Sequence, residues 1–285
     1  MSGVALALVL LAAFAHAGWN FIAKKGGGGS RFVWLYLAAG LAILTPFAAG
    51  YMIVTGWRPS GLGIAFMAGS GLLHALYFMF LQRGYRWGDL SVVYPLARGT
   101  APIIIVAVAV PLFHETPTPL ALAGAAMVVG GVLSLGWMSM RGAAPKTTGV
   151  LYAVITGCFI AAYTLWDKQA VGPLAQAPVV YLWGTFLTQV VLLCPVALGD
   201  RAQTLEIWRS LEKEILAIGF LTPLAYVLVL SALAIAPASY VAPAREVSIV
   251  IGAFLGGQLL GEADVRKRLA ASALIAAGVV AIGIG

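Results

Sequence analysis

The sequence predicts an all-α integral membrane protein in which ten transmembrane helices form two inverted five-helix repeats around a central cavity. Two observations carry this prediction. The 285 residues are 61% hydrophobic and only 9% charged, whereas a soluble domain is roughly 25% charged. Landmark residues also recur at one offset of 147 positions, for example Trp19 with Trp166 and Arg98 with Arg245.

The composition identifies lipid as the main solvent of the chain. So few charges cannot cover a water-facing surface of this size, and the mean hydropathy is +0.97. The net charge of +7 comes from basic residues that lie in loops between apolar runs and form no stripe, so we interpret them as topology signals. No nucleic-acid partner is expected.

Each predicted span is an apolar run of about 20 residues, the length that crosses a bilayer, and short polar breaks separate the runs. The ten predicted spans are 3–23, 32–54, 61–82, 90–112, 118–139, 149–168, 178–198, 213–234, 238–260 and 268–284. The longest polar stretch, Gly199 to Glu214, predicts a surface helix. Residues 1–17 end like a signal peptide but lack its positive start, so we expect a retained first span.

The offset maps every span of the first half onto one of the second half without a gap. It predicts two units, a first repeat over residues 1–140 and a second over residues 148–285. An odd number of spans per repeat makes the second repeat insert upside down, as in many secondary transporters. Small residues in Gly124–Gly131, Gly252–Gly257 and Ala270–Gly278 predict close helix packing.

Several kinds of chemistry have no motif in the chain. The turn Gly26–Ser30 lacks the order of a phosphate-binding loop and follows no strand, which argues against ATP-driven pumping. Cys158 and Cys194 lie in apolar runs without metal-ligand spacing. We therefore expect no cofactor and no metal.

Two arginines and a glutamate are the charged candidates inside the spans, where a charge costs roughly 2.5–3.5 kcal/mol and needs a partner or water. Arg98 and Arg245 each follow a proline-bearing segment. Proline bends a helix and frees a carbonyl, and in a membrane such backbone is tolerated where it faces protein or a wet cavity. Snorkelling or a structural tie is the alternative reading. Glu246 points away from its neighbour Arg245, so it could pair with Arg98 or accept a proton.

Polar and aromatic side chains mark corresponding helix faces in both halves. His16, Trp19 and Asn20 share a face of the first span, and Tyr163, Trp166 and Asp167 share the equivalent face of the sixth. Interfacial anchoring remains the alternative for the tryptophans.

Further aromatic candidates occupy four other spans. His74 and Tyr77 share a face of the third span, and Tyr94, Tyr226 and Tyr240 lie in the fourth, eighth and ninth. Such rings suit apolar or aromatic side chains and can stack on cations, although ordinary helix packing would also account for each of them.

Two further hypotheses concern ionisable groups. Glu246, His16 or His74 could carry a coupling proton. Glu115 and Glu262 are interpreted as groups that fix helix ends and loops.

Several stretches in a fixed order resemble the EamA-type branch of the drug/metabolite transporter superfamily. They are His16-Ala-Gly-Trp-Asn20 with Lys24, Tyr94-Pro-Leu-Ala-Arg-Gly-Thr-Ala-Pro102, Trp166-Asp-Lys168, Ala242-Pro-Ala-Arg-Glu-Val-Ser248 and Leu260-Gly-Glu262. The resemblance implies ten spans in two inverted repeats, and a cavity lined by the first, third, fourth, sixth, eighth and ninth spans. It places these residues near that cavity: His16, Trp19, His74, Tyr77, Tyr94, Arg98, Tyr163, Trp166, Tyr226, Tyr240, Arg245 and Glu246.

Two arguments predict opposite orientations of the protein in the membrane. Nearly all loop lysines and arginines follow odd-numbered spans, and only Arg58 and Lys168 follow even-numbered ones. This asymmetry predicts cytoplasmic odd loops and external termini, whereas the resemblance implies termini in the cytoplasm.

Together these observations predict a monomeric secondary transporter of the inner membrane that exports small amphipathic metabolites, above all amino acids. The arginines would hold a carboxylate, the aromatic residues would hold the side chain, and the repeats would alternate around the site. Efflux of cationic, drug-like compounds is the alternative, and Glu246 is its only candidate carboxylate. An intramembrane lipid-modifying enzyme would need clustered acid and base groups, which the sequence lacks, so no enzyme activity is expected.

Overall fold

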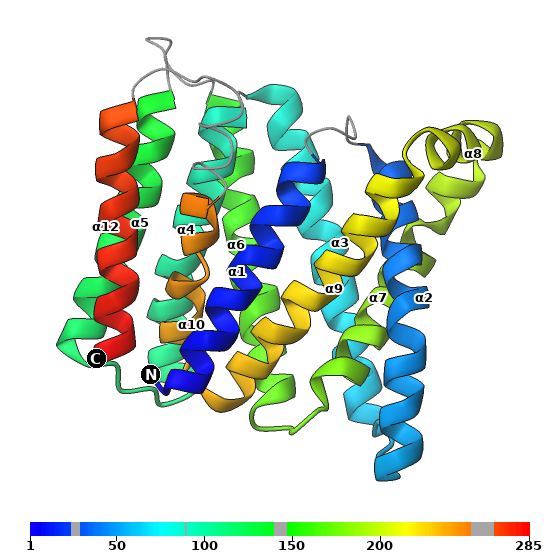
Figure 1. Ribbon diagram of the computed structural model, residues 1–285, viewed down its shortest axis with the longest axis horizontal. Coiled ribbons are helices and arrows are strands. Elements are labelled where there is room, and N and C mark those ends of the chain that lie inside the picture. The colour runs from blue at the N-terminus through cyan, green and yellow to red at the C-terminus, as the bar shows by residue number, and fades with distance from the viewer. Residues whose placement is uncertain (24–28, 89, 140–146, 252–264) are drawn as a thin grey trace.

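The computed structural model describes residues 1–23, 29–88, 90–139, 147–251 and 265–285, and these residues form helices and turns without a strand (Figure 1). Seven of the described helices are long and apolar enough to cross a membrane, and α5 and α12 contribute shorter apolar segments. The helices are α1 Gly3–Ala23, α2 Ser30–Thr55, α3 Gly61–Trp87, α4 Leu90–Leu112, α5 Pro119–Ser139, α6 Thr147–Val171, α7 Pro178–Leu198, α8 Arg201–Ser210, α9 Glu212–Ile235, α10 Ala238–Ala244 and α12 Val265–Ile284.

The helix bounds follow the apolar runs of the sequence closely. Most helices begin and end within a turn of the predicted span, while α3 and α6 extend about one turn further. The surface helix expected between Gly199 and Glu214 is confirmed as α8, whose first turn is capped by the Asp200 carboxylate accepting from the backbone N–H of Gln203.

Large apolar side chains cover the outside of the bundle. Ile53 and Val54 of α2 are more than four-fifths exposed, and Trp137 of α5 is three-quarters exposed. A soluble protein rarely leaves such surface in water. The outward faces therefore suit a bilayer, and the chain is a multi-pass membrane protein.

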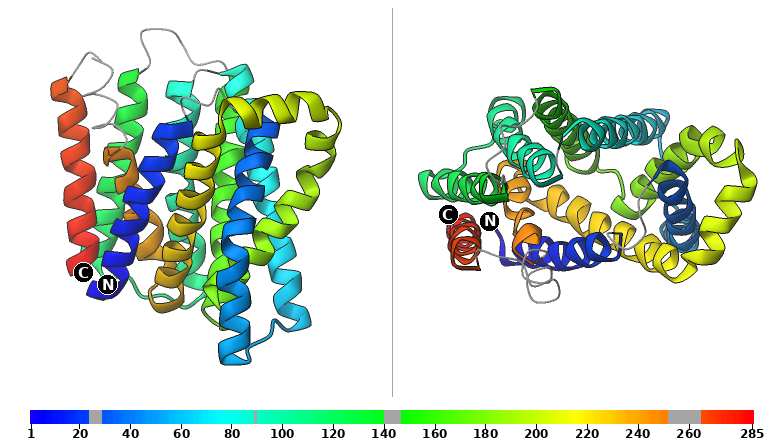
Figure 2. Two further views of the ribbon diagram at one scale, coloured as in Figure 1. Left: turned by 45° about the vertical axis from the view of Figure 1, so that its right-hand side comes forward. Right: turned by 90° about the horizontal axis from the view of Figure 1, so that it is seen from above.

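The helices are arranged around an interior region that α10 partly occupies. Seen from above, α1 and α9 lie along one side, while α3, α4 and α6 lie along the opposite side (Figure 2). The pair α5 and α12 closes one end of this arrangement, and α2 with α7 closes the other. The amino and carboxyl termini lie at the same end of the bundle (Figure 1).

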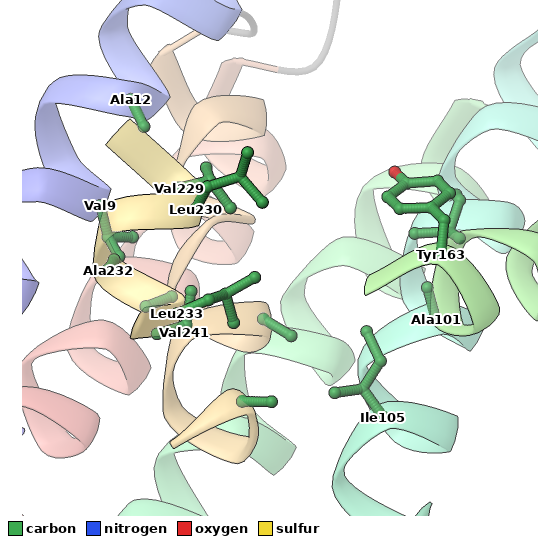
Figure 3. Packing of buried hydrophobic residues seen from close by; sticks show 14 of the residues in the cluster. Val9, Ala12, Ala101, Ile105, Tyr163, Val229, Leu230, Ala232, Leu233 and Val241 are labelled. Carbon is green, nitrogen blue, oxygen red and sulfur yellow. The ribbon is translucent and has the colours of Figure 1, made fainter. Parts of the chain in front are cut away.

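Small and branched side chains fill the interface between α1 and α9. Val9 of α1 lies beside Ala232 of α9, and Ala12 lies on the side of Val229 and Leu230 (Figure 3); all five are nearly or fully buried. In a bilayer such contacts are favoured by close packing and dispersion, because lipid tails are as apolar as leucine.

Glycines allow α5 and α12 to approach each other closely. A Cβ atom on Gly124 would lie 2.6 Å from the backbone oxygen of Gly278, and one on Gly131 would lie 2.9 Å from that of Ala271. The close packing expected for Gly124–Gly131 and Ala270–Gly278 is therefore confirmed. The third stretch, Gly252–Gly257, lies outside the described residues.

The ninth predicted span is not one continuous helix. The structure ends α10 at Ala244, places Arg245 and Glu246 in a turn, and resumes helix at 247–251, where this part of the description ends. Pro243 cannot donate to the carbonyl one turn back, and the Glu246 N–H donates to the Pro243 carbonyl in a tighter, three-residue turn. By contrast, α4 continues through Pro95, Pro102 and Pro111.

Two charged side chains hold the short connection between α9 and α10. The Lys168 ammonium donates to the carbonyls of Leu233 and Ala236 at 2.8 and 2.9 Å. The Glu115 carboxylate accepts from the N–H groups of Ala238 and Ser239, at the beginning of α10. Both placements are favourable, because a cation lies at the carboxyl end of α9 and an anion lies at the amino end of α10. The helix-end role expected of Glu115 is confirmed, whereas Glu262 lies outside the described residues.

The α5–α12 contact predicts a position-specific effect of added methyl groups. Gly124→Ala should destabilise the protein by about 1–3 kcal/mol, because its new Cβ meets backbone that cannot move aside. Gly130→Ala is the matched control, since the nearest atom to its Cβ is a leucine methyl 3.9 Å away. Melting temperatures in detergent should fall for Gly124→Ala only, and an equal fall in both variants would contradict this account of the packing.

Candidate functional site

A cavity of about 280 Å³ lies inside the bundle and extends to one end of it. Its lining runs from mid-helix side chains such as His74 to helix ends at Ala23 of α1 and Tyr85 of α3. Toward the opposite end, where α6 and α9 terminate, none of the described residues beyond Tyr163 and Val229 of these helices lines it. Among the described residues, the cavity therefore extends toward the end of the bundle that holds Ala23 and Tyr85, and not toward the opposite end.

Most of the predicted site residues meet in this cavity. The ones that line it are His16, Trp19, His74, Tyr77, Tyr94, Arg98, Tyr163, Tyr226 and Arg245. The other three lie outside the lining. Trp166 stacks on Phe66 at the side of the bundle, Tyr240 is buried with its hydroxyl accepting from the Thr118 N–H, and Glu246 is buried behind Arg98.

One wall of the cavity is the polar face of α1. The Trp19 indole donates from Nε1 to Nδ1 of His16 at 3.2 Å, and the two rings meet edge to face. The Asn20 amide donates to the His16 carbonyl at 2.8 Å. Because Nδ1 of His16 accepts a hydrogen bond here, the imidazole is neutral, with its proton on Nε2.

The inner end of the cavity is a cluster of rings from three helices. His74 of α3 stacks on Tyr163 of α6 with centroids 3.9 Å apart, and Tyr226 of α9 meets both rings edge-on at 5.3 and 6.2 Å. Tyr77, one turn along α3, also packs edge-on against Tyr163. These rings provide an aromatic surface on which a flat or apolar group can rest.

A buried ion pair joins α4 to the turn after α10. Nε of Arg98 lies 2.9 Å from Oε2 of Glu246, and both side chains are almost inaccessible. Nη2 of Arg98 also lies 3.4 Å from the Ser248 hydroxyl. The pairing of Glu246 with Arg98 that the sequence suggested is confirmed, and the charge of Arg98 is neutralised by it.

Arg245 differs from Arg98 in having no such partner. Among the described residues it forms no ion pair and no side-chain hydrogen bond, and its guanidinium lies 5.8 Å from the centre of the Tyr226 ring. No aspartate or glutamate belongs to the described lining of the cavity. The cavity therefore carries a net positive charge, presented at its aromatic inner end.

Sequence reasoning missed one part of the site and named another without selecting it. The cavity is also lined by α2 and α7, through side chains such as Tyr36 and Gln189, and no pattern in the sequence distinguished these from packing residues. Asp167 is fully buried beside the ring cluster, where it accepts from the hydroxyls of Tyr181 and Tyr226. Its signal was visible as a carboxylate within an apolar run.

One of the comparisons with known proteins identifies a family. Residues 147–284 match the model of the EamA-like transporter family. A crystal structure described only as that of a protein superposes with a TM-score of 0.79 and 16% identity, covering 100% of this chain and 98% of that chain. This likeness concerns the fold alone. No curated protein matches the chain. The second half of the chain thus matches the EamA-like transporter family, a part of the drug/metabolite transporter superfamily whose members carry small molecules across membranes.

Proposed function

We propose that this protein is a secondary transporter of the inner membrane that exports small amphipathic carboxylates, above all amino acids, by alternating access between two inverted repeats. The observation that carries the proposal is Arg245, a guanidinium in an aromatic cavity that forms no ion pair with any described residue. An unpaired buried cation is costly, and a carboxylate is the partner that a guanidinium binds best.

Helix contacts support the inverted repeat of ten spans, with units at residues 1–140 and 148–285. With the 147-residue offset, the α1–α9 contact corresponds to the α6–α3 contact, and the α2–α7 and α5–α12 contacts correspond to themselves. At atomic level, the approach of Gly131 to Ala271 corresponds to that of Gly278 to Gly124. Such equivalence is expected of two copies related by a two-fold axis.

Broken symmetry supports Arg245 as the group that holds the substrate. The offset relates Arg98 to Arg245, but it relates the partner Glu246 to Gly99. Since Gly99 has no side chain, the first repeat supplies no carboxylate to Arg245 from this equivalent position. In this proposal Arg98 and Glu246 shape the wall, and Arg245 binds the carboxylate of the solute.

The remaining lining favours an amphipathic solute over a cation. The rings of Tyr163, Tyr226 and Trp19 suit an apolar or aromatic side chain. A cationic drug would need an accessible carboxylate, and the candidate predicted for that role, Glu246, is engaged by Arg98. The charge of the cavity thus favours anionic or zwitterionic solutes.

The charge distribution also supports an orientation. The cavity extends to the end of the bundle that carries Arg31, Arg83 and Arg86, whereas Arg58 lies at the opposite end of α3. By the positive-inside rule, the basic end faces the cytoplasm. The structure would then represent an inward-open state, ready to load a solute for export.

Arg245→Ala should selectively weaken recognition of carboxylates. In proteoliposomes, uptake of radiolabelled L-phenylalanine should fall roughly 10- to 100-fold in apparent affinity, as expected for a lost charge-assisted contact. The amine 2-phenylethylamine, which lacks the carboxylate, should compete poorly with phenylalanine for uptake by the wild-type protein. Arg86→Ala, an exposed arginine outside the cavity, is the control. Unchanged phenylalanine affinity in Arg245→Ala would refute the carboxylate role.

The Arg98–Glu246 pair predicts a different response. Arg98→Ala should destabilise the protein by about 3–5 kcal/mol, because it leaves a buried carboxylate without its partner. Adding Glu246→Ala should restore most of the melting temperature, since no charge then remains. If the double variant is no more stable than Arg98→Ala, the two side chains do not act as a pair.

The orientation can be tested with two engineered cysteines at opposite ends of α3. In a background without Cys158 and Cys194, a membrane-impermeant maleimide added to intact cells should label Arg58→Cys and leave Arg83→Cys unlabelled until the cells are lysed. The reverse pattern would place the basic end outside and overturn the inward-open assignment.

A further inference from the structure

Asp167 occupies an unusual position for a carboxylate. It lies in the apolar helix α6 with no exposed surface. Its Oδ1 accepts from the Tyr181 hydroxyl of α7 at 2.7 Å, and its Oδ2 accepts from the Tyr226 hydroxyl of α9 at 2.5 Å. The Ser70 hydroxyl of α3 also interacts with it. Four helices therefore meet at one carboxyl group.

No full positive charge compensates Asp167 within the described part of the chain. Its neighbour Lys168 points to the carbonyls of Leu233 and Ala236. Arg245 lies on the ring of Tyr226 and forms no ion pair with Asp167. From α3, His74 is the basic group that faces it, with Nδ1 bonded to the Ser70 carbonyl. A carboxylate buried in a membrane span without a cation needs a proton to neutralise it.

The Tyr181 hydroxyl has two acceptors within reach but only one hydrogen to donate. Besides Oδ1 of Asp167 at 2.7 Å, the Phe66 carbonyl of α3 lies 3.2 Å away. When Asp167 is ionised, Tyr181 donates to it. When Oδ1 carries a proton, Asp167 donates to the Tyr181 oxygen, and the phenol hydrogen is free to point to Phe66. For Tyr226, the described structure offers no comparable second acceptor.

We propose that Asp167 is a proton-binding site, and that protonation of its Oδ1 redirects the Tyr181 hydroxyl from Asp167 to the Phe66 carbonyl of α3. The proton-loaded state then has a continuous chain of hydrogen bonds from α6 through α7 to α3. The ionised state lacks the last link. Proton binding thereby adds a link between α7 and α3 just beyond the closed end of the cavity. This link joins the hydrogen bond that the Trp166 indole of α6 donates to the same Phe66 carbonyl at 2.9 Å in either state.

The site is connected to the cavity by two of its lining residues. Tyr226 lines the cavity with its ring and binds Asp167 with its hydroxyl. His74 lines the cavity and lies 3.4 Å from the Ser70 hydroxyl through Nδ1. A solute that engages Arg245 above the Tyr226 ring is therefore one side chain away from the proton, which would couple the two within the proposed transport cycle.

The other repeat supplies a natural comparison. The 147-residue offset relates Asp167 to Asn20, the neutral isostere, which lines the cavity and donates to the His16 carbonyl. The equivalent of Tyr181 is Trp34, whose indole donates to the Val190 carbonyl. The proton site therefore belongs to the second repeat only, and Asn20 identifies Asp167→Asn as a substitution of matching shape.

Infrared difference spectroscopy on the purified protein in lipid nanodiscs tests this site without any solute. As pH is raised, wild type should lose a protonated-carboxyl band, and Asp167→Asn should lack that band throughout. Glu115→Gln, which removes the carboxylate at the start of α10, should keep it. Tyr181→Phe should keep the titration but shift the band, because the acid loses its hydroxyl partner.

The outcomes separate the two proposals. A wild-type band that persists unchanged in Asp167→Asn, or a Tyr181→Phe spectrum that matches wild type, would overturn the proton site. Because the probe is the proton alone, either result would leave carboxylate binding at Arg245 untouched. Conversely, if the protein did not transport phenylalanine in proteoliposomes, the proposed function would fail but the infrared test of Asp167 would still be valid. If Asp167→Asn fails to fold, the Tyr181→Phe shift still decides the question.

Discussion

The buried ion pair between Arg98 and Glu246 is the interaction on which the interior of this protein depends. Two charges inside a bilayer span are tolerated when they compensate each other and their remaining hydrogen-bonding groups find partners. The pair connects α4 to the turn where α10 ends, with Ser248 as a further partner of the guanidinium. The pair therefore fixes the interrupted helix in place. Arg245 immediately precedes Glu246 on that turn, so its position is fixed as well.

The same pair determines the electrostatics of the cavity. Because Glu246 is engaged by Arg98, it is not free to pair with Arg245, whose guanidinium lies over the face of Tyr226. In the proposed repeat, this follows from the replacement of a glutamate by Gly99 at the equivalent position. A two-fold scaffold lets both bundles move alike, and its broken positions give an asymmetric solute a defined orientation.

A second asymmetry separates solute from proton in the proposed mechanism. Asp167 and its equivalent Asn20 differ by one ionisable group, so the second repeat alone can exchange a proton at the closed end of the cavity. Tyr226 contacts both Arg245 and Asp167. One tyrosine is thus placed to transmit the occupancy of either site to the other, without a direct contact between the two charges.

The helices were largely predictable from the sequence because apolar runs of membrane length leave little choice of secondary structure. Pairing of Glu246 with Arg98 was one of two roles that the sequence suggested, since Glu246 points away from its neighbour Arg245. The helix break at Arg245 was not predicted, because proline does not always end a helix. Pro243 interrupts its helix, whereas the three prolines of α4 leave that helix continuous.

Asp167 was seen but not selected, because its importance depends on Tyr181, a residue of another helix that no local pattern connects to it. The participation of α2 and α7 in the cavity was missed for the same reason. Pairings between distant helices are set by how the bundle packs, and the hydrophobic pattern of one span contains no record of them.

The most direct test of the central claim is a structure of the protein determined with L-phenylalanine bound. The account predicts the carboxylate of the amino acid within hydrogen-bonding distance of the Arg245 guanidinium, its ring against Tyr163 or Tyr226, and the Arg98–Glu246 pair intact. A carboxylate bound to Arg98 with that pair broken, or an amino acid bound outside the cavity, would contradict it.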